Sequence, residues 1–295
     1  MGKRIVPIVF ATDDNYVLPL AVAIKSMLKN KSGNDEYKIY VFCDDLSEKS
    51  INILKEVCGK EYLEIVRVDK YLTNTDFYEV GHVSLAAYYR FFIPKILSHY
   101  DKVLYLDCDI LINNDIGKLY DVELGDNILS GNRMFGADND YVNSGILLFN
   151  VKEYLKNDVC EKCIKYIADH RDLKYPDEQA LNDVCKGKIK PLDYKFNYQT
   201  FFCGEQKTLD MAGVKKIKDI YVIHYSDKPW KFSPTPFGNL WWKTAKKMPK
   251  DIKNEIYAKY GQYQNQDDCC YYKYYFASPL GKLIYKIKKK LKKNK

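Results

Sequence analysis

The first 70 residues alternate between short apolar runs and amphipathic stretches, and this alternation limits the fold more than any other feature of the chain. Strands are predicted at residues 5–10, 38–43 and 63–68, and helices at residues 16–28 and directly after Ser47, a residue type favoured at helix N-caps. Strands that alternate with helices pair in parallel through crossover connections. The sequence therefore predicts an α/β fold with a Rossmann-like, mainly parallel central sheet flanked by helices.

A further buried strand is predicted at residues 103–111, and it runs into two carboxylates, Asp107 and Asp109. Residues i and i+2 of an extended chain point to the same side, so both carboxylates can face one ligand. Two like charges that are buried together need a cationic partner. Carboxylates at the carboxyl end of such a strand suit Mn²⁺ or Mg²⁺, ions that complete their shell with substrate phosphates. We therefore predict a metal site here, with a solvated acidic turn as the alternative.

The same motif also resembles that of another enzyme class. An apolar run followed by D-x-D is found in phosphatases of the haloacid dehalogenase type, where the first Asp is a nucleophile. Those enzymes resemble D-x-D-x-[TV] and usually carry the motif on the first strand. Here Leu111 takes the last position and about a hundred residues precede the motif. A phosphatase stays open as the alternative function.

The charge of the chain is concentrated at its end. The eight lysines from Pro279 onward, with no acid among them, account for the whole net charge of +8. Leu280, Leu283, Ile284, Ile287 and Leu291 fall on one helical face, as in a helix that lies on anionic lipid. We predict a domain at residues 1–265 and an aromatic, lysine-rich tail at 266–295, with membrane attachment through residues 279–295. Nucleic acid is not expected as a partner, and a disordered solubilising tail is the alternative.

Cysteine usage and hydropathy indicate the cellular compartment in which the protein functions. The nine cysteines are odd in number and scattered, which favours reduced thiols in a cytoplasm. No apolar run reaches the length of a membrane span. With the basic tail, these features predict a cytoplasmic protein that lies peripherally on the inner face of the plasma membrane.

Polar residues beside other predicted elements complete the candidate site. Arg90 is the only charge in the apolar and aromatic stretch 84–93 of the predicted helical segment 83–97, where it can be a structural ion-pair member or a partner for a buried acid. His224 stands at the end of a late strand, 220–225, and gives Mn²⁺ an imidazole ligand opposite the two aspartates. Lys228 follows and is placed to neutralise a diphosphate. Asn143-Ser144-Gly145 precede a core strand, where they let the backbone approach a ligand closely.

Taken together and in order, five segments resemble glycosyltransferase family 8, which includes glycogenin and bacterial lipooligosaccharide galactosyl- and glucosyltransferases. The segments are residues 10–16, 105–109, 143–145, 178–179 and 224–230, and the likeness spans about residues 4–232. The resemblance implies a GT-A fold and a retaining, Mn²⁺-dependent hexosyltransferase that uses UDP-glucose or UDP-galactose. It also implies a glycan or lipid-linked acceptor in bacterial surface polysaccharide or lipopolysaccharide synthesis.

The resemblance also implies roles for single residues. The metal ligands would be Asp107, Asp109 and His224, for Mn²⁺ or, as the alternative ion, Mg²⁺. Glu178, Gln179 and Lys228 would be the catalytic candidates. The UDP-sugar would lie against Ala11, Asp13, Asn15, Arg90, Asp107, Cys108, Asn143, Ser144, Glu178, Gln179 and Lys228.

The chain departs from the family pattern at two places, both beside the sugar and phosphate pocket. Glu178-Gln179-Ala180 stands where the bacterial galactosyltransferases resemble Asp-Gln-Asp, and Asp227 replaces a glycine in a shortened loop. No residue is a certain carboxylate nucleophile, so same-face attack by the acceptor hydroxyl is expected, with the departing phosphate taking its proton. An inactive sugar-nucleotide-binding protein is the non-enzymatic alternative, which the intact set of polar residues disfavours.

Overall fold

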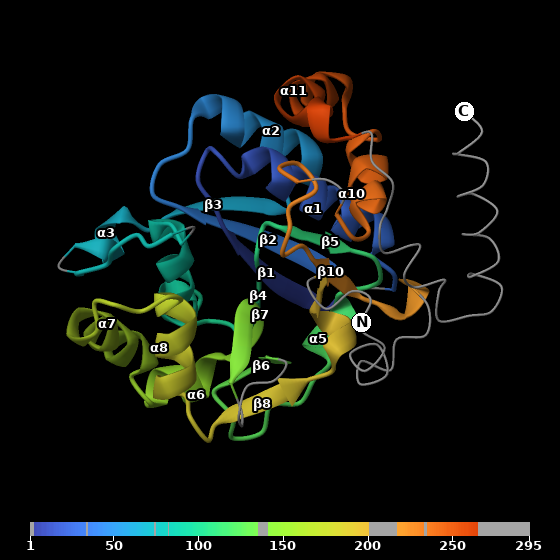
Figure 1. Cartoon of the computed structure of the whole chain (residues 1–295). Helices are drawn as coiled ribbons and strands as arrows, with labels where there is room; N and C mark the ends of the chain where they lie inside the picture. The colour runs from blue at the N-terminus through green and yellow to red at the C-terminus, as the bar shows by residue number, and fades with distance from the viewer. Residues whose placement is uncertain are drawn as a thin grey trace, which may run out of the picture.

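The computed structural model of the chain describes residues 3–33, 35–73, 75–81, 83–134, 141–200, 217–232 and 235–264. The predicted tail, residues 266–295, lies outside the described residues. In the described part, a seven-stranded sheet lies between two layers of helices (Figure 1). None of the described helices combines the length and the apolar character needed to cross a membrane.

The central sheet is mainly parallel, as the sequence predicts. Its strands β3, β2, β1 and β4 run parallel, β7 is antiparallel to both of its neighbours, and β8 is parallel to β6. In spatial order the strands are β3 (Leu63–Arg67), β2 (Glu36–Cys43), β1 (Ile5–Ala11), β4 (Lys102–Leu106), β7 (Val142–Asn150), β6 (Leu129–Arg133) and β8 (Ile189–Leu192).

Helices cover both faces of this sheet, which explains why its strands read as continuous apolar runs. Side chains alternate between two separate cores, so that Leu104 and Leu106 belong to one and Val103 and Tyr105 to the other. The first core is covered by α1 (Val17–Asn30), α2 (Glu48–Cys58), α10 (Gly238–Ala245) and α11 (Lys250–Tyr260). The second is covered by the 3-10 helix η1 (Leu85–Phe92), α4 (Ile93–Ile96), α6 (Val151–Lys156), α7 (Val159–Asp169) and α8 (Pro176–Val184).

The remaining described helices and 3-10 turns are short. They are α3 (Asp69–Leu72), α5 (Gly117–Tyr120) and the 3-10 turns η2 (Tyr194–Phe196), η4 (Ile217–Asp219) and η5 (Gly261–Tyr263). Ser47 is the N-cap of α2, as the sequence predicts, and its hydroxyl accepts a hydrogen bond from the Ser50 backbone N–H. The helical segment expected at 83–97 is present, but its first part is the 3-10 helix η1.

The strand predicted at residues 103–111 is divided between two sheets. Strand β4 ends at Leu106, and β5 (Ile110–Ile112) belongs to a second sheet with β10 (Val222–His224) and β9 (Tyr198–Gln199). The backbone N–H of Asp107 still donates to Gly145 in β7, whereas the carbonyl of Asp109 accepts from Tyr225 beyond β10. The chain therefore changes sheets at Cys108, and the two aspartates lie at the junction.

Candidate metal and donor site

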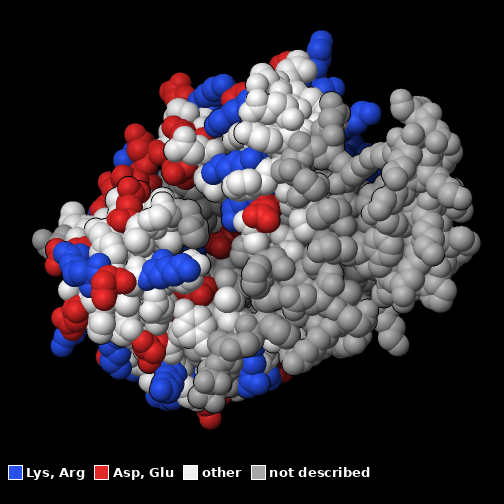
Figure 2. Space-filling model, viewed as in Figure 1, with Lys and Arg blue, Asp and Glu red and all other residues white. Residues whose placement is uncertain are grey.

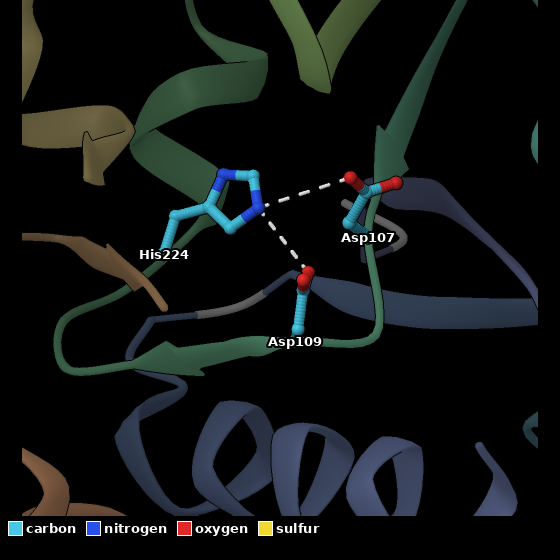
Figure 3. Close-up of side chains that lie close together, drawn as sticks. All are labelled: Asp107, Asp109 and His224. Carbon is cyan, nitrogen blue, oxygen red and sulfur yellow. Dashed lines mark ion pairs between the residues drawn. The ribbon is translucent and has the colours of Figure 1, made fainter. Parts of the chain in front are cut away.

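Asp107, Asp109 and His224 converge at the junction of the two sheets, as predicted (Figure 3). Strand β10 pairs antiparallel with β5 and places His224 opposite Ile110. As a result, the Nε2 atom of His224 lies 3.2 Å from Oδ1 of Asp109 and 3.8 Å from Oδ2 of Asp107. One ligand atom from each of the three residues fits within a span of 4.8 Å.

This geometry fits a small divalent ion. Neighbouring donors of an octahedral ion with bonds of about 2.1 Å lie about 3.0 Å apart, close to the separations seen here. The donor set of two carboxylates and one imidazole suits Mn²⁺. A β-carbon at position 145 would lie 2.7 Å from Oδ2 of Asp107, so Gly145 keeps this space open for the carboxylate. We conclude that the residues present can hold such an ion.

Protein cations already accompany both carboxylates. Nη2 of Arg90 lies 3.2 Å from Oδ1 of Asp107, and the Tyr105 hydroxyl donates to the same oxygen at 2.6 Å. Nζ of Lys228 lies 2.9 Å from Oδ2 of Asp109. The need to balance two part-buried carboxylate charges is thus met by Arg90 and Lys228. The case for a metal rests on the three converging donors instead.

The surroundings shift the pKa values of the three residues in different directions. Burial raises the pKa of Asp107 above its ordinary value, although Arg90 opposes this. Burial acts the same way on Asp109, but Lys228 and then His224 outweigh it and hold the pKa of Asp109 well below its ordinary value. Burial alone would lower the pKa of His224, but Asp109 and Asp107 raise it. A metal ion would therefore compete with a proton for Nε2 of His224.

Arg90 acts as both a structural ion-pair member and a partner for an acid at the site. Besides Asp107, its guanidinium lies 3.3 Å from Asp177 and donates to the carbonyl and the hydroxyl of Ser144, each at 2.7 Å. The Arg90 side chain is 5% exposed. It thereby joins β4, β7 and the first turn of α8 from inside the protein.

Glu178 lies against the first residues of β7 and is closely surrounded by hydrogen-bond donors. Its Oε2 accepts hydrogen bonds from the Ser144 backbone N–H and from Nδ2 of Asn143, both at 2.9 Å, and Tyr141 also bonds to the carboxylate. Burial raises the pKa of Glu178 to about 7. In contrast, Oε1 of Gln179 accepts from the Tyr175 backbone N–H at the start of its own helix. No hydrogen bond between described residues ties Gln179 to the metal-site residues.

The residues expected against the nucleotide gather where β1 ends. The Cys108 thiol donates to the carbonyl of Ala11 at 3.1 Å, which ties the two strand ends together. Oδ1 of Asp13 accepts from the backbone N–H groups of Asn15 and Tyr16 and shapes the turn into α1. Asn15 is exposed. In the view of Figure 2, the surface of the molecule has a hollow near its centre, with acidic side chains inside it.

Three residues that the sequence interpretation did not single out take part in the site. Tyr105 lies two positions before Asp107 in the strand, and this i, i+2 spacing is a signal that could have identified it. Asp177 pairs with Arg90 one position before the predicted Glu178. The third is Asn197, whose Oδ1 lies 2.9 Å from Nδ1 of His224. No sequence pattern marks Asn197.

Known proteins resemble the chain in sequence. A family model described as glycosyl transferase family 8 matches residues 7–233. Glycosyltransferase GlyE of Streptococcus pneumoniae is 27% identical over 270 residues, which cover 88% of this chain and 65% of GlyE. The lipopolysaccharide 1,2-glucosyltransferase of Escherichia coli is 28% identical over 244 residues, which cover 74% of this chain and 71% of that protein. The chain thus spans slightly less than two thirds of GlyE.

Solved structures resemble the chain in fold. The crystal structure of an active-site mutant of LgtC matches with a TM-score of 0.71 and 25% sequence identity, covering 85% of this chain and all of that chain. LgtC has the GT-A fold, and the mainly parallel sheet with flanking helices described above is the same architecture. The fold is therefore the GT-A fold that the resemblance implied.

Proposed function

Because the chain belongs to glycosyltransferase family 8, we propose that it transfers a hexose from a UDP-sugar to a glycan or lipid-linked acceptor, with retention of anomeric configuration. In this proposal Asp107, Asp109 and His224 bind Mn²⁺ or, as the alternative ion, Mg²⁺. The observation that supports it most is the convergence of these three side chains within 4.8 Å at the carboxyl ends of β1 and β4. Ligands of open α/β sheets bind at such strand ends.

Among the described residues, Lys228 is the one best placed to assist departure of the nucleotide. Its ammonium lies beside Asp109, so a diphosphate held at the metal ligands would lie within its reach. When bound, a divalent ion supplies Lewis-acid stabilisation of the negative charge that develops on the leaving diphosphate. The ammonium of Lys228 adds a second, fixed positive charge to the same place.

The surroundings of Glu178 favour same-face attack by the acceptor hydroxyl. The Glu178 carboxylate already accepts bonds from Asn143, Ser144 and Tyr141, and these donors reduce the strength of its oxygens as nucleophiles. The acceptor hydroxyl then forms the new bond to the anomeric carbon while the bond to the diphosphate breaks. Its proton passes to the departing diphosphate. Arg90, Asn143 and Ser144 would line the sugar pocket, and Ala11, Asp13 and Asn15 the nucleoside end.

The relatives and the sequence support the proposed acceptor and location. One relative is named a lipopolysaccharide 1,2-glucosyltransferase, which supports a role in bacterial surface polysaccharide or lipopolysaccharide synthesis. Attachment to the inner face of the plasma membrane through residues 279–295 stays a sequence prediction, since those residues lie outside the described part.

A panel of UDP-sugars tests the function directly. The full chain is incubated with UDP-glucose, UDP-galactose and other UDP-sugars with Mn²⁺ and without added acceptor, and slow release of UDP is measured. We expect release from one hexose donor, abolished by EDTA and by Asp109→Asn. Release of phosphate from p-nitrophenyl phosphate without any reaction of UDP-sugars would favour the phosphatase alternative. Binding of a UDP-sugar without turnover, even with acceptor glycans added, would favour an inactive binding protein.

A further inference from the structure

The far side of the His224 ring is held by a buried asparagine. Nδ1 of His224 lies 2.9 Å from Oδ1 of Asn197, and the two side chains are buried together. Asn197 follows the turn η2 and directly precedes β9, which pairs in parallel with β10. Its own backbone N–H is bonded to the carbonyl of Tyr194. Asn197 is therefore fixed by the same small sheet that carries the histidine.

A chain of hydrogen bonds determines which way the Asn197 amide points. The backbone N–H of Gly145 can only donate, and it donates to Oδ1 of Asn143 at 3.2 Å. Because this atom of Asn143 must be oxygen, Nδ2 of Asn143 faces Glu178, whose oxygen accepts at 2.9 Å. The same Oδ1 of Asn143 also lies 2.8 Å from Asn197, so Asn197 must present its NH₂ group there.

The direction of these bonds then decides the protonation of the ring. With its NH₂ group turned to Asn143, Asn197 can offer only its oxygen to His224. An oxygen accepts, so Nδ1 of His224 must carry a proton. The neutral ring therefore has its lone pair on Nε2, the atom that faces Asp107 and Asp109.

We propose that Asn197 is a positioning residue, which fixes the His224 ring and keeps the proton on Nδ1 so that Nε2 is available as a metal ligand. The inference rests on the proposed metal centre and extends it. Metal-ligating histidines depend on such a partner for ring orientation and tautomer. Asn197 also donates to Asn143, which in turn donates to Glu178. His224 and the Glu178 carboxylate therefore belong to one chain of hydrogen bonds.

Two variants separate this role from a merely structural one. Asn197→Leu keeps the size of the side chain and removes both bonds. Asn197→Asp keeps an oxygen for Nδ1–H and removes the donor to Asn143. Mn²⁺ binding to the full chain, without nucleotide, is followed by the electron paramagnetic resonance signal of the free ion. Asn197→Leu should weaken binding by about 10- to 100-fold, and Asn197→Asp should recover most of the loss.

A matched control keeps the result interpretable. Asn113→Leu removes the bonds that Nδ2 of Asn113 makes to the carbonyls of Ile217 and Ile220, just before β10, without touching the ring. It should bind Mn²⁺ like the unaltered chain. If Asn197→Leu also binds Mn²⁺ within about twofold of the unaltered chain, the inference is wrong. If the unaltered chain and Asp109→Asn bind Mn²⁺ equally, the proposed metal centre itself fails.

A measurement on the unaltered chain covers the case in which Asn197→Leu does not fold. The ¹⁵N-labelled protein is loaded with Cd²⁺ as a diamagnetic probe, and the ring nitrogens of His224 are assigned by long-range ¹H–¹⁵N spectroscopy. The ion should be on Nε2 and the proton on Nδ1. Cadmium on Nδ1 would overturn the inference.

Discussion

A β-carbon at Gly145 would lie 2.4 Å from Cε1 of His224, so strand β7 and the histidine ring meet with no room between them. The position of Gly145 is fixed by its bond from the Asp107 backbone N–H and by the pairing of its neighbour Ile146 with Leu106. The ring is fixed by Asn197 on its other side. Glycine at this position is therefore what allows the imidazole to approach the two aspartates.

Gly145→Ala should displace the ring and weaken metal binding. Because neither the strand nor the ring can yield easily, we expect Mn²⁺ affinity to fall by about 10- to 100-fold. The free energy of unfolding should fall by about 1–3 kcal/mol from overpacking. Gly238→Ala is the control, since the atom nearest to its new β-carbon would be 3.4 Å away. Equal Mn²⁺ affinities for the two variants would contradict the steric explanation.

Replacing Arg90 should destabilise the protein as well as the site. Arg90→Met leaves the buried Asp177 and the part-buried Asp107 without their cation, which should cost about 3–5 kcal/mol in urea unfolding. Arg90→Lys should recover only part of this lost stability, because one ammonium cannot contact Asp107, Asp177 and Ser144 together. The exposed Arg67, paired with Asp45, is the control, and Arg67→Met should cost about 1 kcal/mol or less. A similar loss in the free energy of unfolding for Arg90→Met and Arg67→Met would contradict the prediction that the buried ion pairs of Arg90 stabilise the protein.

Glu178 should give the stability of the protein a distinct dependence on pH. Its pKa is raised from 4.5 to about 7, chiefly by burial, so between these values the folded chain holds a proton that the unfolded chain has lost. Stability should therefore fall as pH rises through this window, by up to about 1.4 kcal/mol per pH unit from this group. Glu178→Gln should remove this slope in urea unfolding measured from pH 5 to 8. If the free energy of unfolding depends on pH in the same way for the unaltered chain and for Glu178→Gln, the raised pKa of Glu178 is wrong.

Lys228 and Lys231 should differ in their effect on turnover. The Lys228 ammonium lies at Asp109, whereas that of Lys231 lies over the Tyr16 ring, 5.0 Å from its centre. Lys228→Ala should lower kcat/KM for the UDP-sugar by about 10²- to 10³-fold through lost stabilisation of the leaving diphosphate. Lys231→Ala should change it by about tenfold or less, as expected of a more distant, solvated charge. Initial rates of UDP release against donor concentration distinguish the two, and equal losses would contradict the assignment.

Much of the fold could be predicted because the central sheet is buried on both faces. That burial makes β1, β2 and β4 continuous apolar runs, and their alternation with helices determines the parallel pairing. The pairing of Asp107 with Asp109 and His224 could also be predicted, in part from spacing and in part from the family resemblance. The likeness expected at about residues 4–232 agrees with the family match at 7–233.

Other features depend on contacts that no local pattern reveals. The change of sheet at Cys108 is fixed by a bond between Asp109 and Tyr225, far apart in the sequence. The sequence around Asn197 shows neither a periodic pattern of apolar residues nor a motif. Asn197 lies beside His224 because β9 pairs with β10. In the first turn of α8, sequence reasoning favoured Glu178 and Gln179, whereas Asp177 is the residue paired with Arg90. Helix geometry, and not residue type, places Asp177 beside Arg90 and Glu178 beside Ser144.

Crystals of the full chain grown with MnCl₂ and UDP test the metal centre most directly, through the anomalous difference density of manganese. A peak should lie at about 2.1–2.3 Å from Oδ2 of Asp107, a carboxylate oxygen of Asp109 and Nε2 of His224, with oxygens of the diphosphate completing its shell. A manganese ion that binds UDP away from these three side chains would contradict the proposed centre.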